Sequence, residues 1–265
     1  MTFVFDRETA LVSRGDGSLY IEASEIYRNP TGAAFGGWVA AIMTKAVQDH
    51  EECSGPVVSV QTTFIAGVGP GEVNVTVRLL KSGASTQFWR VELSQTVGIV
   101  AVSDIVSSNR RPTDLNYQIP MPVAKPASES PTLRQGEDNP PFWVSTYEQK
   151  IARGVPFSVN ENPESLVWIK ETDGRPLDRL NIVSICDTPM PRTFFLSDEL
   201  RMGATVSMGT YIYASEEDIA AAGSDYLLLR VDGATSRNSA TDQRVELWSQ
   251  NGTLLATSNQ IGFFR

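Results

Sequence analysis

The chain ends in RVELWSQNGTLLATSNQIGFFR, residues Arg244–Arg265, and has a near-copy of this stretch at Arg90–Val106, RVELSQTVGIVAVSDIV. The shared RVEL sets an offset of 244 − 90 = 154 positions. Solenoid repeats have periods of about 20 to 50 residues, so an offset this long indicates one domain that is encoded twice. With one residue inserted, Ile105 of the first copy falls opposite Gln260 of the second.

Length and composition are typical of a globular protein with room for two domains. The chain has 265 residues, of which 41% are hydrophobic, and two domains of this size can each bury a core. The formal charge is −9, from 22 basic and 31 acidic residues. Because phosphate neutralisation needs a basic face, we expect no nucleic-acid partner.

The sequence shows no sign of export or of membrane insertion. No apolar run approaches the ~20 residues of a membrane span, and the first residues, MTFVFDRET, lack the basic and apolar regions of a signal peptide. Cys53 and Cys186 have neither disulfide nor metal-ligand spacing. We therefore expect a cytoplasmic location and no membrane span.

Several catalytic classes are excluded by residue types. His50 is the single histidine, which excludes HExxH zinc sites and most histidine-based metal centres. We interpret it as a capping residue at a helix end. No Gly-x-Ser-x-Gly motif is present, and the GVGPG run at 67–71 is interpreted as a turn between strands. We expect no metal and no cofactor.

Hydrophobic periodicity predicts similar element orders in the two halves. In the first, a strand at 17–27 precedes a helix at 38–50, followed by strands at 57–66, 72–81 and 87–107, the last divided near 96–98. In the second, strands at 142–156 and 165–171 precede a helix at 177–185 and strands at 204–213, 226–232 and 242–264. An Asn-Gly turn is predicted at 251–252, and residues 215–224 are predicted to form a loop or one helical turn.

A segment rich in Pro and Ser, residues 111–141, has no periodicity and is interpreted as an extended linker. We therefore predict a first domain at 1–110 and a second at 142–265.

When the two copies are aligned, polar residues of the second copy occupy positions that are apolar in the first. Aligning the two middle strands at an offset of 207 − 59 = 148 places Val57 opposite Thr205. Asp187 ends an otherwise apolar segment, where a buried carboxylate is costly unless it is hydrogen-bonded or functional. A carboxylate can take a proton from water that attacks an acyl carbon, while a hydroxyl and an amide hold the water in line. Alternatively, Asp187 only bonds local backbone ahead of Pro189.

These features resemble a known family. FGGWVAAIMTKAV in the first copy, with ATVSMGTYIY and NGTLLATSNQ in the second, looks like the double hot-dog acyl-CoA thioesterases, relatives of bacterial acyl-CoA thioesterase II. The resemblance covers nearly the whole chain. It implies an α+β fold, a tandem hot-dog of two antiparallel sheets that each wrap around a long central helix. It also implies hydrolysis of acyl-CoA, or of a related acyl thioester, in fatty acid metabolism.

The resemblance places the catalytic residues in the second domain and leaves the first with a degenerate site. Asp187 matches the family's acidic position, Thr205 its hydroxyl and Gln260 its amide, which implies attack by an Asp-activated water without a covalent intermediate. Asp198 is the alternative acid. Ser207 is the alternative hydroxyl and a candidate substrate-binding residue.

The start of the first predicted helix is a candidate substrate-binding segment. Backbone N–H groups around Phe35, Gly36, Gly37 and Trp38 are expected to polarise a thioester carbonyl. Alternatively, the two glycines serve only close packing of the helix on a sheet.

Two rival functions remain. Hot-dog hydratases and dehydratases use a catalytic histidine, whereas His50 lies in the half without the triad. A non-catalytic acyl-binding protein would keep the fold without the chemistry. Because hot-dog sheets often pair edge to edge, we also expect a homo-oligomer.

Overall fold

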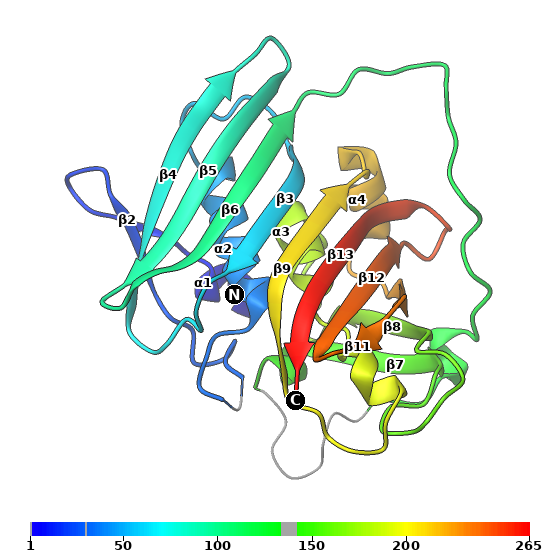
Figure 1. The fold of residues 1–265 in the computed structure, drawn as a ribbon. Helices are drawn as coiled ribbons and strands as arrows, with labels where there is room; N and C mark the ends of the chain where they lie inside the picture. The colour runs from blue at the N-terminus through cyan, green and yellow to red at the C-terminus, as the bar shows by residue number, and fades with distance from the viewer. Residues whose placement is uncertain (1, 30, 134–141) are drawn as a thin grey trace.

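A computed structural model describes residues 2–29, 31–133 and 142–265 of the chain. Its strands form one sheet in the order β1-β2-β4-β5-β6-β3-β9-β13-β12-β10-β8-β7, with β11 paired to β12. All these pairings are antiparallel. Figure 1 shows the central strands side by side, with helices α2 and α3 behind them.

The described residues of the first half form two helices and six strands. Their bounds are α1 Val4–Glu8, β1 Val12–Ser13, β2 Leu19–Glu22, α2 Gly36–Gln48, β3 Val57–Phe64, β4 Glu72–Ser82, β5 Thr86–Gln95 and β6 Gly98–Ser108. The predicted division of the 87–107 strand is confirmed by β5 and β6. The strand predicted at 17–27 is wrong beyond Glu22, because the Ser24 hydroxyl accepts the N–H groups of Ile26 and Tyr27 and closes a turn.

The second half contains the remaining strands. The bounds are β7 Tyr147–Arg153, β8 Ser165–Glu171, α3 Arg179–Ile185, β9 Gly203–Ile212, α4 Glu216–Ala222, β10 Leu227–Asp232, β11 Ser236–Arg237, β12 Ala240–Trp248 and β13 Leu254–Phe264. The described residues also form 3-10 helices, η1 Ala127–Glu129 in the predicted linker and η2 Phe142–Thr146 and η3 Arg192–Phe195 in the second half. The loop or single turn predicted at 215–224 is instead the seven-residue α4, because Ser215 and Asp218 form a reciprocal capping box.

The prediction of two separate sheets is wrong, because the halves join edge to edge. Ser59–Thr63 of β3 pairs with Ser207–Tyr211 of β9, so each edge strand satisfies the backbone groups of the other. Helix α2 contacts α3 as well as β3, β4, β5 and β6. Buried side chains of both halves form one hydrophobic core, which the two halves therefore share.

The two central helices differ in length. Helix α2 has 13 residues and is buried over most of its length. Helix α3 has only seven, beginning at the Asp178 cap, so the prediction of a long central helix is wrong for the second half. Pro189 and Pro191 cannot continue a helix. The chain after α3 is thus free to line the cavity described below.

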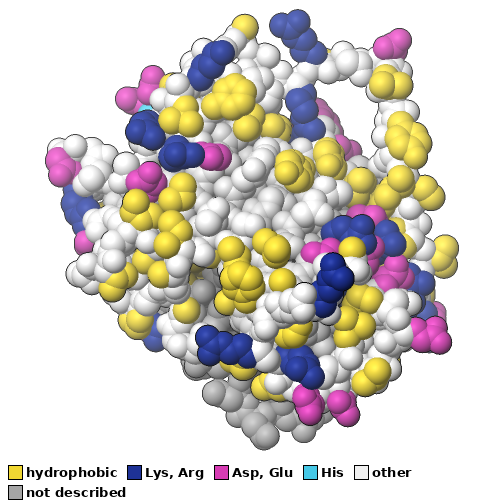
Figure 2. Space-filling view, viewed as in Figure 1, with side chains coloured by type: hydrophobic (Ala, Val, Ile, Leu, Met, Phe, Trp, Pro, Cys, Tyr) yellow, Lys and Arg dark blue, Asp and Glu magenta, His cyan; other side chains and the backbone are white. Residues whose placement is uncertain are grey.

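The predicted linker packs on the second half where the structure describes it, and its residues 134–141 lie outside the described residues. Gln118 donates to the Gly252 carbonyl at 2.7 Å and accepts the Leu254 N–H at 3.1 Å. Met121, Ala124 and Ala127 cover a small core that contains Trp168 and Trp248. The outer face of β9 and β13 is uncovered, and hydrophobic side chains are visible there (Figure 2).

Candidate active site

The two halves share an irregularity that determines which side chains face inward. A bulge leaves Val58 unpaired between β3 and β6, and a second leaves Val206 unpaired between β9 and β13. The offset of 206 − 58 = 148 is the one found in the sequence. Because side chains alternate along a strand, the extra residue moves Thr205 to the inner face with Met208 and leaves Ser207 on the outer face.

Gln260 lies at the centre of the polar contacts on the inner face. Its Nε2 donates to Asp187 Oδ1 at 3.0 Å and to the Cys186 carbonyl at 3.3 Å. Its Oε1 accepts a hydrogen bond from the Thr205 hydroxyl at 3.3 Å. The structure therefore brings together the three residues that the family resemblance placed in one triad, with the amide between the carboxylate and the hydroxyl.

The Asp187 carboxylate lies at the N-terminus of α2. It follows α3 in the chain and accepts a hydrogen bond from the Gly37 N–H. The N-cap residue of α2, Phe35, provides no side-chain cap, so a carboxylate of the second half meets the free N–H groups and the positive end of the helix dipole. A Cβ on Gly36 would lie 2.6 Å from Asp187 Oδ2. Glycine is therefore required for this close approach.

Burial raises the pKa of the Asp187 carboxyl to about 7, against the hydrogen bonds from Gln260 and the Gly37 N–H, which stabilise the carboxylate. A carboxyl with a pKa near neutrality can accept a proton and return it under the same conditions. The local environment of Asp187 therefore suits a general base.

Asp187, Thr205 and Gln260 line a cavity of about 780 Å³, within the range of small-molecule sites. Phe35, Gly36 and Phe64 of the first half contribute to its wall, together with Trp143. The rings of Phe35 and Trp143 stack with centroids 4.1 Å apart, and Trp143 Nε1 donates to Asn29 Oδ1 at 2.9 Å. Both halves therefore build this largely apolar wall.

Other residues predicted for the site lie elsewhere. Trp38 is fully buried and donates to the Glu8 carbonyl at 2.7 Å, so it belongs to the core and not to the cavity wall. Ser207 pairs with Ile261, which is 46% exposed on the outer face. Asp198 is exposed on the segment after η3. Of the predicted substrate-binding residues, Phe35 and Gly36 reach the cavity wall.

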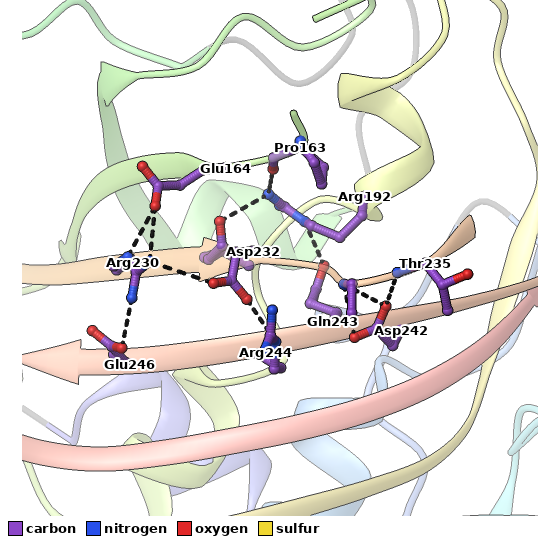
Figure 3. A network of polar contacts seen from close by, with 12 residues as sticks. Pro163, Glu164, Arg192, Arg230, Asp232, Thr235, Asp242, Gln243, Arg244 and Glu246 are labelled. Carbon is purple, nitrogen blue, oxygen red and sulfur yellow. Dashed lines mark hydrogen bonds and ion pairs between the residues drawn. The ribbon is translucent and has the colours of Figure 1, made fainter. Parts of the chain in front are cut away.

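Gln243 is a polar residue of the cavity wall that the sequence prediction missed. It pairs directly with Gln260 across β12 and β13. Its Oε1 accepts a hydrogen bond from Arg192 Nε at 3.0 Å (Figure 3). The signal lay one position before the shared RVEL, where Trp89 stands opposite Gln243. In the first half Trp89 pairs with Ile105, so both positions are apolar there.

Arg192 anchors the segment after α3. Burial lowers the pKa of its guanidinium to about 9, with the charge of Asp232 acting in the opposite direction. Its N–H groups donate to the Pro163 carbonyl at 2.7 Å (Figure 3). They also donate to the Met190 carbonyl at 2.6 Å and to Ser165 Oγ at 3.0 Å. Contacts of this number and geometry fix the position of the guanidinium.

The described residues contain no group of three or more His, Cys, Asp or Glu side chains placed to hold a metal ion. Within the same ranges, no helix is both long and apolar enough to cross a membrane.

Solved structures define the class of fold. A conserved protein of unknown function with a hot dog fold from Alicyclobacillus acidocaldarius is 27% identical, with a TM-score of 0.94 over 100% of this chain and 99% of that one. The tesB protein of Mycobacterium avium subs. paratuberculosis is 17% identical, with a TM-score of 0.80 and 98% of each chain covered. Acyl-CoA thioesterase II TesB2 of Mycobacterium marinum is 16% identical, with a TM-score of 0.78 and coverage of 99% and 98%. The chain is thus similar to hot-dog proteins over its whole length.

Family models identify the chain more closely. The acyl-CoA thioesterase N-terminal domain matches residues 26–107, and the C-terminal domain matches residues 123–264. The chain belongs to this acyl-CoA thioesterase family. No curated protein matches it.

Proposed function

We propose that the chain hydrolyses an acyl-CoA, or a related acyl thioester, to the free acid and the thiol. The observation that carries the proposal is the buried Asp187 carboxylate, which accepts a hydrogen bond from Gln260 at 3.0 Å beside a largely apolar cavity. Membership of the acyl-CoA thioesterase family supports thioesterase activity in general. The cavity supplies the apolar wall that an acyl chain needs.

In the proposed mechanism, Asp187 takes a proton from a water as the water oxygen attacks the thioester carbon. Gln260 and Thr205 hold this water in line with the carbonyl. The C–S bond then breaks with its electron pair on sulfur, and Asp187 gives its proton to the thiolate. Free acid and thiol leave, the carboxylate is restored, and no covalent intermediate forms.

The start of α2 is assigned to the thioester carbonyl. The Gly37 N–H is already bonded to Asp187, whereas the Gly36 N–H donates to no backbone carbonyl of the turns, loops and caps that the structure describes. Gly36 also lines the cavity. Its N–H is therefore the backbone donor available to stabilise the developing negative charge on oxygen.

We interpret residues 1–110 and 142–265 as two hot-dog domains, of which the second carries the triad and the first contributes the start of α2. Val57 and Ile105 of the first are buried and apolar, so they cannot replace Thr205 and Gln260. A homo-oligomer and a cytoplasmic location stay predictions.

The test is release of free thiol from a panel of short, medium and aromatic acyl-CoAs, followed with a thiol reagent. We expect release from at least one class. A protein that binds acyl-CoA but releases no thiol across the panel would instead be the acyl-binding alternative. A hydratase would need a catalytic histidine at the cavity. The ring centroid of His50 lies 5.0 Å from that of Trp89, and His50 does not line the described cavity.

The pH dependence of kcat/KM is expected to follow the ionisation of Asp187. The pKa of its carboxyl is raised to about 7, and the base is the ionised form, so activity is present above this pH and is lost below it. In the acid limb, kcat/KM should fall about tenfold per pH unit. A profile that stays flat from pH 5 to pH 8 would contradict the role of Asp187 as the base.

A further inference from the structure

Gln243 presents an oriented amide to the cavity beside the candidate triad. Arg192 has only hydrogen-bond donors, so the Gln243 atom 3.0 Å from its Nε is the amide oxygen. The amide nitrogen then lies on the other side of the group. No hydrogen bond among the described residues uses Gln243 Nε2, and the residue lines the cavity. A fixed donor is therefore available to a ligand.

The Gln243 donor lies next to the candidate catalytic residue Gln260. Gln243 and Gln260 are directly opposite each other in the antiparallel pair of β12 and β13. Side chains in such pairs start about 4.5–5.5 Å apart at Cβ and share one face of the sheet. A substrate atom bound to Gln243 would therefore lie within a few bonds of the thioester carbon that Gln260 serves.

Thr193 carries a second polar group that has no hydrogen-bond partner among the described residues. Its side chain is 3% exposed and lines the same cavity, and its hydroxyl forms no hydrogen bond with the described residues. Burying a hydroxyl without a partner is unfavourable. The hydroxyl oxygen is itself enclosed, so Thr193 adds polar character to this part of the wall, and Gln243 is the donor that is open to the cavity.

We propose that Gln243, beside Thr193, forms a polar subsite that binds an oxygen of the substrate close to the thioester. Gln243 donates through Nε2, and Arg192 positions the amide. The oxygen belongs either to a hydroxyl or oxo group near the thioester end of the acyl chain or to an amide carbonyl in the arm that carries the thiol. The inference rests on the proposed thioesterase function and adds a substrate class to it.

The experiment compares kcat/KM for octanoyl-CoA and 3-hydroxyoctanoyl-CoA in the wild type and in two variants. Gln243→Glu keeps the shape and an acceptor for Arg192 but replaces the Nε2 donor with an acceptor. Gln243→Met removes the amide without adding charge. Gln61→Met, at an exposed position of β3, is the control, and melting temperatures verify folding.

If the bound oxygen belongs to the acyl chain, both variants are expected to lose about tenfold more in kcat/KM for the hydroxylated substrate than for octanoyl-CoA. If the bound oxygen belongs to the carrier arm, the kcat/KM of both variants is expected to fall by about tenfold, equally for the two substrates. Wild-type values for both substrates in folded Gln243→Met would overturn the subsite, as would a loss confined to Gln243→Glu, which would reflect charge alone. Absence of thiol release by the wild type would overturn the proposed function itself and the subsite with it.

Discussion

Replacing Asp187 with asparagine is expected to lower kcat by about 10²–10⁴-fold, the usual contribution of a general base. Asparagine has nearly the same shape, and its amide oxygen can still accept the hydrogen bond that Gln260 Nε2 donates at 3.0 Å. It cannot take a proton from water. The measurement is steady-state thiol release, with the melting temperature as a check that the variant is folded.

The matched control is Asp198→Asn. Asp198 is exposed and is not among the described residues of the cavity wall, so its kcat should equal that of the wild type. Full activity in Asp187→Asn, combined with loss in Asp198→Asn, would show that the alternative acid is the base.

Replacing Gly36 with alanine is expected to lower kcat/KM by about 100-fold, because misplacement of a catalytic group by about 1 Å can cost this much. The new Cβ would lie 2.6 Å from Asp187 Oδ2 and 3.3 Å from Phe64 Cζ. Either the carboxylate or the start of α2 must move, so the hydrogen bond to the Gly37 N–H is disturbed. Thiol release and thermal unfolding of the same preparation separate a local effect from a global one.

Gly69→Ala is the control for this substitution, since a Cβ there would lie 3.8 Å from its nearest neighbour, Gln95 Oε1. We expect wild-type activity from it. A Gly36→Ala enzyme with wild-type kcat/KM would mean that the close approach of α2 to the carboxylate has no catalytic importance.

Local patterns in the sequence predict much of this fold because they depend on neighbouring residues alone. Alternating apolar residues and Gly/Pro turns predict most strands of each half, and the internal copy predicts that Thr205 and Gln260 act together. Those two residues meet on one face only because of the bulge at Val206. Plain alternation would have placed Thr205 outward with Ser207.

Features that depend on contacts between the halves were beyond sequence periodicity. Pairing of β3 with β9 merges two expected sheets into one, and the carboxylate that meets the start of α2 comes from the other half of the chain. Gln243 was missed for a different reason. Gln243 lies one position before the matched RVEL, where the first copy has the apolar Trp89. The similarity between the two copies therefore does not extend to Gln243.

Isotope transfer in a single turnover tests the central claim most directly. With enzyme in excess over acyl-CoA in H₂¹⁸O, direct attack by an Asp187-activated water predicts one ¹⁸O in the released acid and an unlabelled Asp187 peptide. Unlabelled acid with ¹⁸O in the Asp187 carboxyl would show an acyl-aspartate intermediate and contradict the account.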